Sequence, residues 1–175
     1  MILSNVLQSI LAITLIAIAH SGEARTKAYP SPDGILRAVV IPVGKKGYED
    51  QESRIEIHIL SGHTLSGKIL RWRSFASQDG EHGYGINHGE WTADSQFFIF
   101  NADSSGGHQP WRLATFFYRR SANRFYSLEN YIGPVTSDFT LERKDEVKTT
   151  HFNFEAKNEK EPVTVRLSKL VGRRQ

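Results

Sequence analysis

Three of the seven histidines in this chain of 175 residues lie near several carboxylates in two polar, glycine-rich segments, 77–91 and 101–111. Neutral imidazoles together with a carboxylate can hold zinc or another divalent transition metal. The spacing of these residues matches no zinc-binding signature. The residue types nevertheless predict a set of metal ligands that consists of His82, His88 and His108 with one of Asp79, Glu81 or Asp103.

The second segment also places a hydroxyl nucleophile near a base. Ser104 or Ser105 could attack a carbonyl carbon while His108 accepts the hydroxyl proton, as in hydrolases that form an acyl-enzyme. The segment lacks the Gly-x-Ser-x-Gly elbow of serine hydrolases, and a base three or four residues from its nucleophile seldom reaches the required geometry. The enzymatic alternative that we retain is therefore a metal-dependent hydrolase.

The same two segments also suit roles without catalysis. In one, Asp79, Asn101 and Asp103 form turns with nearby backbone amides, and the segments are hydrogen-bonded loops. In the other, they form a binding surface for a protein, peptide or glycan of the cell envelope, and a non-enzymatic binding or envelope-associated domain is the function that we favour over the hydrolase. The candidate contacts are Asp79, Glu81, His82, Tyr84, His88, Asp103, Ser104, Ser105, His108, Trp111 and Arg112.

The first 24 residues have the composition of a signal peptide. They contain no Lys or Arg, and residues 10–19 are apolar apart from Thr14. This run is too short to span a bilayer, which needs about 20 apolar residues. Gly22 and Ala24 provide the small side chains of a cleavage site, although a basic amino-terminal region is missing. We expect cleavage after Ala24 and a periplasmic or extracellular domain, 25–175; an uncleaved anchor is the alternative.

Composition excludes several classes of protein. The chain has no cysteine, so disulfides, thiol catalysis and thiolate zinc sites are ruled out. Its formal charge is only +3 and its basic residues are scattered, which argues against a nucleic-acid partner. Basic pairs such as Lys45-Lys46 and Arg119-Arg120 suit solvated turns or contact with an anionic cell surface. No segment after the signal peptide is apolar enough to span a membrane.

The hydrophobic pattern after the signal peptide predicts strands almost throughout. Residues 54–60 alternate between isoleucine and polar side chains, as expected for a strand buried on one face. The predicted strands are 36–43, 54–60, 65–75, 88–91, 97–100, 115–118, 124–128, 138–142, 150–155 and 163–167. The aromatic core is expected to include Phe97, Phe98, Phe100, Phe116, Phe117, Phe125, Phe152 and Phe154. The fold class is therefore all-β with antiparallel sheets.

Two turns have matching contexts. Ser31-Pro32-Asp33-Gly34 precedes one apolar strand and Thr92-Ala93-Asp94-Ser95 precedes another, and the two aspartates are 61 positions apart. The motif resembles the Ser-Pro-Asp-Gly turn of TolB-like, WD-type exported β-propeller repeats, which also occurs in dipeptidyl-peptidase-like proteins. Other segments, including Trp-Thr-x-Asp-Ser-Gln-Phe-Phe and Tyr-Ile-Gly-Pro-Val-Thr, are similar to a family of bacterial exported proteins. These resemblances imply export and blade-like sheets but no particular activity.

The resemblance covers residues 29–130 and implies two four-stranded units, 29–75 and 88–130, followed by carboxy-terminal strands in 136–168. A closed propeller needs at least about four blades, so we expect a partial propeller or a sandwich, which a homodimer could complete. If 88–91 and 97–100 are antiparallel neighbours, segments 77–89 and 101–111 lie at the same end of their sheet. The polar segment 44–52 of the first unit is expected to border that end.

Overall fold

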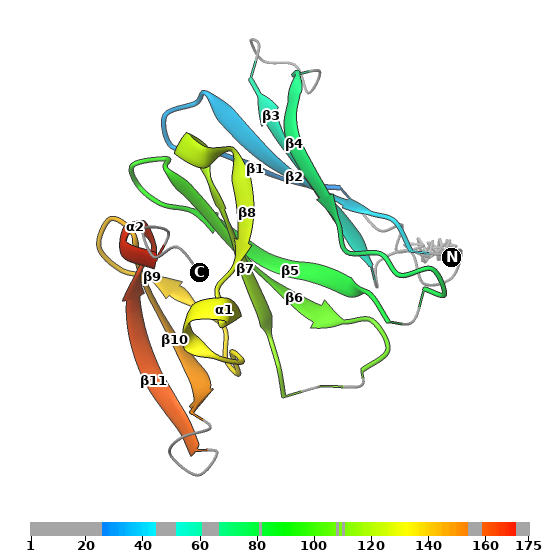
Figure 1. Cartoon of the computed structure of the whole chain (residues 1–175). Coiled ribbons are helices and arrows are strands. Elements are labelled where there is room, and N and C mark those ends of the chain that lie inside the picture. Colours follow the sequence, from blue (N-terminus) through cyan, green and yellow to red (C-terminus); the bar gives the residue numbers. More distant parts are fainter. Residues whose placement is uncertain are drawn as a thin grey trace, which may run out of the picture.

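Three antiparallel sheets make up the protein (Figure 1). The structure is a computed structural model that describes residues 26–44, 52–60, 67–80, 82–107, 109, 111–153 and 159–170. Within these residues only three short helical turns interrupt the strands: η1 (Arg120–Ala122), α1 (Glu129–Ile132) and α2 (Leu167–Leu170). The predicted all-β fold class with antiparallel sheets is confirmed.

Two four-stranded sheets follow the order of the chain, each strand pairing with the next. The first sheet contains β1 (Lys27–Pro30), β2 (Leu36–Pro42), β3 (Ser53–Ile59) and β4 (Ile69–Ser74). The second contains β5 (Tyr84–Trp91), β6 (Phe97–Ser104), β7 (Ala114–Arg119) and β8 (Arg124–Ser127). The third sheet has the order β11-β10-β9 and contains β9 (Thr140–Leu141), β10 (Glu146–Asn153) and β11 (Glu159–Arg166).

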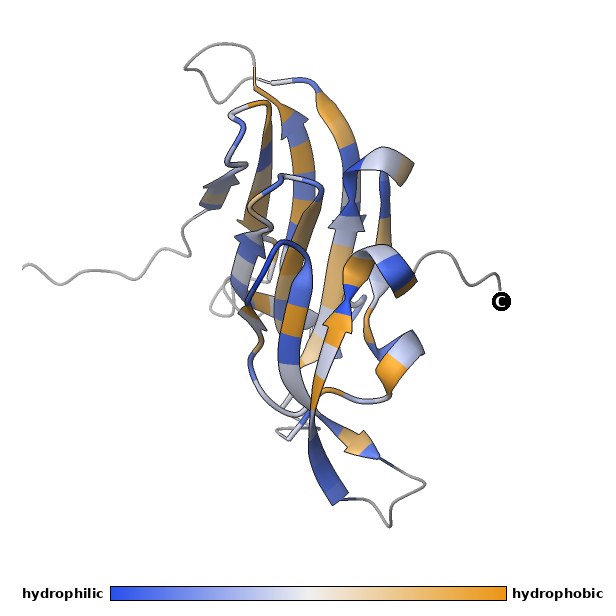
Figure 2. Cartoon of the chain, turned by 90° about the vertical axis from the view of Figure 1, so that its left-hand side faces the viewer, coloured by the Kyte–Doolittle hydropathy of each residue, from blue (hydrophilic) through white to orange (hydrophobic). Residues whose placement is uncertain are grey.

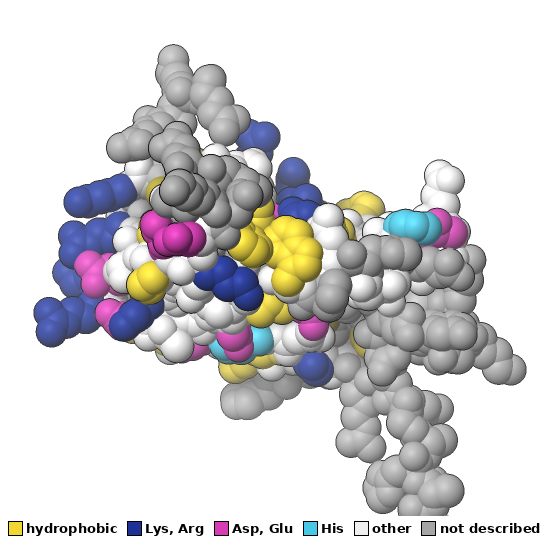
Figure 3. Space-filling model, turned by 90° about the horizontal axis from the view of Figure 1, so that it is seen from below, with side chains coloured by type: hydrophobic (Ala, Val, Ile, Leu, Met, Phe, Trp, Pro, Cys, Tyr) yellow, Lys and Arg dark blue, Asp and Glu magenta, His cyan; other side chains and the backbone are white. Residues whose placement is uncertain are grey.

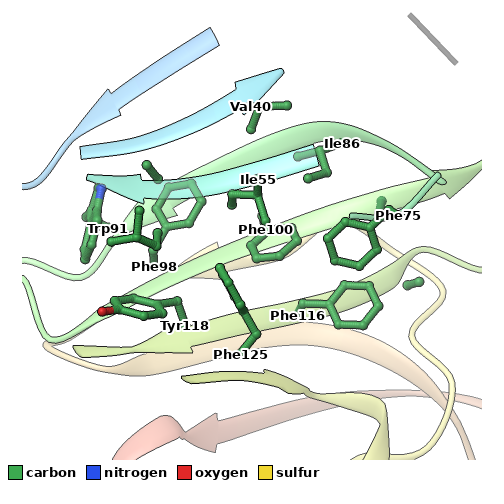
Figure 4. Close-up of a cluster of buried hydrophobic side chains, with 14 of the residues drawn as sticks. Val40, Ile55, Phe75, Ile86, Trp91, Phe98, Phe100, Phe116, Tyr118 and Phe125 are labelled. Carbon is green, nitrogen blue, oxygen red and sulfur yellow. The ribbon is translucent and has the colours of Figure 1, made fainter. Parts of the chain in front are cut away.

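The second sheet lies in the middle and is covered on both faces. Along β6, Phe98 and Phe100 point toward Ile55 of the first sheet, as Figure 4 shows. The alternate side chains of the same strand, Phe97 and Ile99, belong to a second core that is shared with the third sheet and both α-helices. Figure 2 shows the matching bands of hydrophobic and hydrophilic residues along the strands. Because side chains alternate across a strand, one aromatic run can contribute to both cores.

The turn before β2 is held by its own side chains. Ser31 Oγ donates to Asp33 Oδ1 (2.6 Å) and accepts from the Leu36 amide (2.9 Å). The Ser31 amide donates to the Leu36 carbonyl at 2.8 Å. Gly34 takes a positive φ of 70°, a conformation that glycine adopts without steric cost.

The turn before β6 repeats this pattern bond for bond. Thr92 Oγ1 donates to Asp94 Oδ1 (2.7 Å) and accepts from the Phe97 amide (3.0 Å), and the Thr92 amide donates to the Phe97 carbonyl (2.9 Å). Ser95 takes the left-handed position with φ 59°. The prediction that the two aspartates occupy equivalent turn positions is therefore confirmed.

The two turns also contact each other. Ser95 Oγ accepts a hydrogen bond from the Asp33 amide at 3.0 Å, and Arg120 forms an ion pair with the Asp33 carboxylate. Nearby, the indole of Trp91 donates to the carbonyl of Tyr29 at 2.8 Å. The first and second sheets are thus joined by polar contacts at the turns as well as by the apolar core.

Two details of the sequence prediction are wrong. Strands β5 and β6 are longer than predicted, so about half of segment 77–91 and about a third of segment 101–111 are strand, because cross-strand pairing continues to Tyr84 and Ser104. Phe152, expected in the core, is only half-buried and lies edge-on to the exposed Trp111, with their ring centroids 5.0 Å apart. The third sheet is too small to bury it. Phe154 lies outside the described residues.

Candidate functional site

The two polar segments meet at one end of the second sheet, as predicted. The Ser105 amide donates to the Gly83 carbonyl at 2.9 Å, and Tyr84 pairs with Ser104 in the register of β5 and β6. The convergence follows from the tight turn that folds β6 back on β5. Glu81 and His108, however, lie outside the described residues.

Glu52, at the end of the first unit's polar segment, joins the two segments. Its carboxylate is 1% exposed and accepts hydrogen bonds from the Ser77 hydroxyl (2.6 Å), the Ser77 amide (3.1 Å), the Gly83 amide (2.9 Å) and the Ser105 hydroxyl (3.1 Å). Burial alone would raise the pKa of Glu52, but these hydrogen bonds lower it overall, so the buried group stays ionised. Ser105 is thus engaged in holding the loops together.

His82 and Asp79 form a local pair on the surface of the first polar segment. Asp79 Oδ2 lies 2.5 Å from His82 Nδ1, and Asp79 Oδ1 accepts from the His82 amide at 3.2 Å. The second contact spans three positions rather than the two of an Asx-turn, so the Asx-turn expected for Asp79 stays a prediction. Both side chains are more than half exposed.

His88 lies in a different environment, on the face of β5 that looks toward the third sheet. Its ring stacks on Phe139 with centroids 4.5 Å apart, and its Nδ1 lies 2.9 Å from Asp138 Oδ1. The same carboxylate accepts from Asn101 Nδ2 (2.5 Å), and Thr115 donates to Asn101 Oδ1 (3.0 Å). Buried Asn101 and Thr115 therefore orient Asp138, which orients the imidazole.

Asp103 extends this polar group along β6. Its carboxylate accepts a hydrogen bond from the side-chain Nδ2 of Asn87. Burial together with the nearby charge of Asp138 raises the pKa of Asp103, although the Asn87 contact opposes the rise. The prediction that Asn101 and Asp103 form Asx-turns is wrong, because both residues lie within β6.

The predicted amphipathic contacts are partly engaged within the fold. Arg112 Nε donates to Glu129 Oε1 at 2.9 Å, and this pairing raises the pKa of Arg112. Tyr84 packs partly against the first core. Trp111 is 42% exposed and remains available for contact.

The metal hypothesis is not tested where it depends on Glu81 and His108. Within the described ranges, His82 and His88 have different carboxylate partners, and no group of three His, Cys, Asp or Glu side chains could hold a metal ion. Asp138 was not predicted to have a chemical role, because it was expected only as part of the strand 138–142.

The outer face of the first sheet, which was not among the predicted sites, combines exposed apolar side chains with charged ones. It carries three of the four large hydrophobic side chains that are exposed in the described part of the chain: Ile35 (48%), Ile69 (46%) and Trp72 (59%). Because Leu36 and Ile57 face the core, their neighbours along each strand face outward. We call this surface the Trp72 face, which comprises Ile35, Arg37, Val39, Glu56, His58, Ile69 and Trp72.

Cross-strand pairing makes the Trp72 face continuous. His58 pairs with Arg37 on one side and Ile69 on the other, and Glu56 pairs with Trp72 in the next row. Glu56 is 7% exposed, and its carboxylate oxygens contact Arg54 Nη2 (2.9 Å) and His58 Nε2 (2.8 Å). The Glu56 carboxylate is therefore already paired, with a guanidinium and an imidazole.

The charge that remains on the Trp72 face is positive. Arg37 takes part in none of the ion pairs found among the described residues. A signal for this surface was present in the sequence, where Trp72 stands between Arg71 and Arg73 in a predicted strand. The sequence could not show that this strand lies at the edge of its sheet.

Several solved structures are similar to this chain. Among them, the crystal structure of TolB from Acinetobacter baumannii is similar with a TM-score of 0.43 and 12% identity, over 81% of this chain and 29% of TolB. The chain therefore spans less than a third of that protein's length. No family model and no curated protein matches the sequence. Nothing in the sheets is specific to WD-type repeats.

Within the described residues, no helix is long and apolar enough to cross a membrane.

Proposed function

We propose that this chain is an exported, non-enzymatic binding domain of the cell envelope that binds a protein partner through its Trp72 face. The observation that carries the proposal is the grouping of Ile35, Ile69 and Trp72 on one sheet face. Soluble proteins seldom expose contiguous apolar surface unless it binds something. Among the described residues the other two sheets do not offer such a face, because the second packs against a core on each side and the exposed residues on the strands of the third include Lys148, Lys160 and Arg166.

The chemistry of the face indicates the kind of partner. Trp and Arg are the residues most enriched at the centres of protein interfaces, and on this sheet Arg54 lies on the strand next to Trp72 while Arg37 lies one strand further away. Since the only carboxylate in the patch is buried and paired, an incoming carboxylate would meet unopposed positive charge. The partner therefore presents apolar side chains flanked by Asp or Glu.

Site-specific photocrosslinking in the producing cells tests the proposal. A photoreactive residue at position 72 should capture one main partner, whereas the same residue at Arg124, on β8 of the second sheet, should not. The captured protein is then purified, and the Kd of its complex with this chain is measured. We expect Trp72→Ser to weaken binding by at least about tenfold and to leave stability unchanged within about 0.5 kcal/mol, because the indole is 59% exposed.

Two results would contradict this assignment. One is equal crosslinking from positions 72 and 124, and the other is an unchanged Kd for Trp72→Ser with the purified captured protein. A crosslinked product of twice the chain mass would instead identify a second copy as the occupant and replace the partner proposed here with a homodimer.

Export is a separate part of the proposal and rests on the apolar run 10–19 and the small residues before Arg25. We expect a periplasmic or secreted protein that begins at Arg25. Amino-terminal sequencing of the protein from fractionated cells measures this. An intact Met1 on soluble cytoplasmic protein would contradict export, and an intact Met1 on membrane-bound protein would indicate an anchor.

A further inference from the structure

A cavity of about 390 Å³ lies between the β9–β10 turn and α2. A second hollow of about 320 Å³ shares Glu146, Arg166 and Lys169 with it. The cavity has the size of a small-ligand pocket. Its lining is polar and mostly basic, and consists of Arg143, Lys144, Asp145, Glu146, Arg166, Ser168 and Lys169.

Both carboxylates of the cavity are already engaged. Asp145 is 8% exposed, and its Oδ2 accepts a hydrogen bond from the Ser168 amide at 2.8 Å while its carbonyl accepts from Leu167 at 3.0 Å. Glu146 is paired with the guanidinium of Arg166, whose Nε lies 2.9 Å from Glu146 Oε1. These contacts fix the walls of the cavity and leave neither carboxylate free to neutralise the remaining cations.

Three cations of the lining have no such pairing. Arg143, Lys144 and Lys169 appear in none of the ion pairs formed among the described residues. Four cations and two carboxylates leave a formal charge of +2 at the cavity. Seen from below, Lys and Arg side chains also gather on the side of the molecule where the third sheet lies (Figure 3).

Lys144 is held in an unusual backbone conformation. Its φ is 51°, in the left-handed region that favours glycine and asparagine. The Glu146 amide donates to the Arg143 carbonyl at 2.9 Å and closes the turn around it. A lysine at this position therefore places an ammonium group at the cavity despite a less favourable backbone.

We propose that this cavity binds a phosphate-bearing anion. A phosphate monoester carries close to two negative charges at neutral pH and three acceptor oxygens, which matches a formal charge of +2 and several N–H donors. The guanidinium of Arg143 can contact two phosphate oxygens at once, while Lys144 and Lys169 contribute compact charges. The phosphate belongs either to a soluble compound or to the headgroup of an anionic lipid.

Isothermal titration calorimetry of the full chain with inorganic phosphate, at low salt and about pH 8, tests the site. We expect saturable binding, and a Kd about fivefold higher in Lys144→Gly and in Lys169→Gln. Lys144→Gly should be at least as stable as the wild type, since glycine accepts a positive φ, so weaker binding cannot be due to unfolding. The charge-matched control Lys68→Gln, at the far end of the first sheet, should bind like the wild type.

Vesicle sedimentation separates the two sources of phosphate. Vesicles of phosphatidic acid, whose headgroup is a phosphate monoester, in phosphatidylcholine are compared with phosphatidylcholine alone, and every variant keeps residues 1–24 so that any lipid contact of their apolar run is the same in all. Phosphate binding that depends on Lys144 and Lys169, without vesicle binding, assigns the site to soluble phosphates. Vesicle binding with the same dependence assigns it to lipid headgroups. Failure of both probes, or equal binding by Lys144→Gly and Lys68→Gln, overturns the proposal.

Discussion

Replacing Glu52 by glutamine tests whether one buried carboxylate holds the two polar segments together. Three of its four hydrogen bonds end on Oε1 and one, from the Ser77 amide, on Oε2. Glutamine can accept the first three hydrogen bonds only if its carbonyl oxygen takes the place of Oε1. Its NH₂ group then faces the Ser77 backbone N–H, so that two hydrogen-bond donors face each other. One lost charge-assisted bond with an unsatisfied donor costs about 2 kcal/mol, or about 4 to 8 °C in a domain of this size.

The destabilisation should depend on pH in a defined direction. The pKa of Glu52 is lower in the folded protein than its ordinary value of 4.5. Its stabilising contribution is therefore complete above pH 4.5 and is lost as the pH falls through the folded pKa. Glu52→Gln lacks this titration, so its difference from the wild type should shrink below about pH 4.

Urea unfolding, monitored by tryptophan fluorescence at about pH 7 and about pH 3.5, measures both the loss of stability and its dependence on pH. The matched control is Glu90→Gln, because Glu90 is an exposed carboxylate on β5 of the neighbouring sheet. The control should change stability by less than about 0.5 kcal/mol. A Glu52→Gln variant as stable as this control at pH 7 would refute the role given to the carboxylate.

Three further predictions concern stability and one concerns metal. Asp94→Ala should cost about 1 kcal/mol or more, because the Asp94 carboxylate accepts two hydrogen bonds in its turn, and thermal unfolding measures the loss. Gly89→Ala should cost about 1 to 3 kcal/mol by the same assay, since its Cβ would lie 2.5 Å from the buried ring of Phe98. Asp138→Ala should cost about 1 to 3 kcal/mol and change the proton chemical shifts of the His88 ring, because it leaves a buried amide unpaired. Mass spectrometry of the purified protein should find no stoichiometric metal, and metal that a chelator removes would revive the hydrolase alternative.

Local rules accounted for the parts of this fold that depend on neighbouring residues. Alternation of Ile55 and Ile57 with polar residues predicted a strand with one apolar face, and in β3 both isoleucines face the first core, although Glu56 between them is buried as well. The Asp33 and Asp94 turns were predictable because their bonds run over only five residues. The meeting of the two polar segments followed from one tight turn between antiparallel strands.

The parts that were not predicted depend on contacts between distant residues. Glu52 is separated from Ser77 by 25 positions and from Ser105 by 53, and no local pattern marks an acid that will be buried. Asp138 reaches His88 across 50 positions for the same reason. The Trp72 face was missed because exposure of a strand depends on its position in the sheet, which hydrophobic alternation does not specify.

The hydrogen bond from the Asp33 amide to the Ser95 hydroxyl has a consequence for design. A repeat protein built only from the first unit would have glycine at every equivalent position, and its turns would lack the hydroxyl that joins neighbouring sheets. One built only from the second unit would have the hydroxyl but would hold a serine at positive φ in every turn, as Ser95 does at 59°. An extended array that alternates the two units would therefore form this bond at every second junction, because the Asp94 amide would meet the glycine of the first unit, which has no hydroxyl.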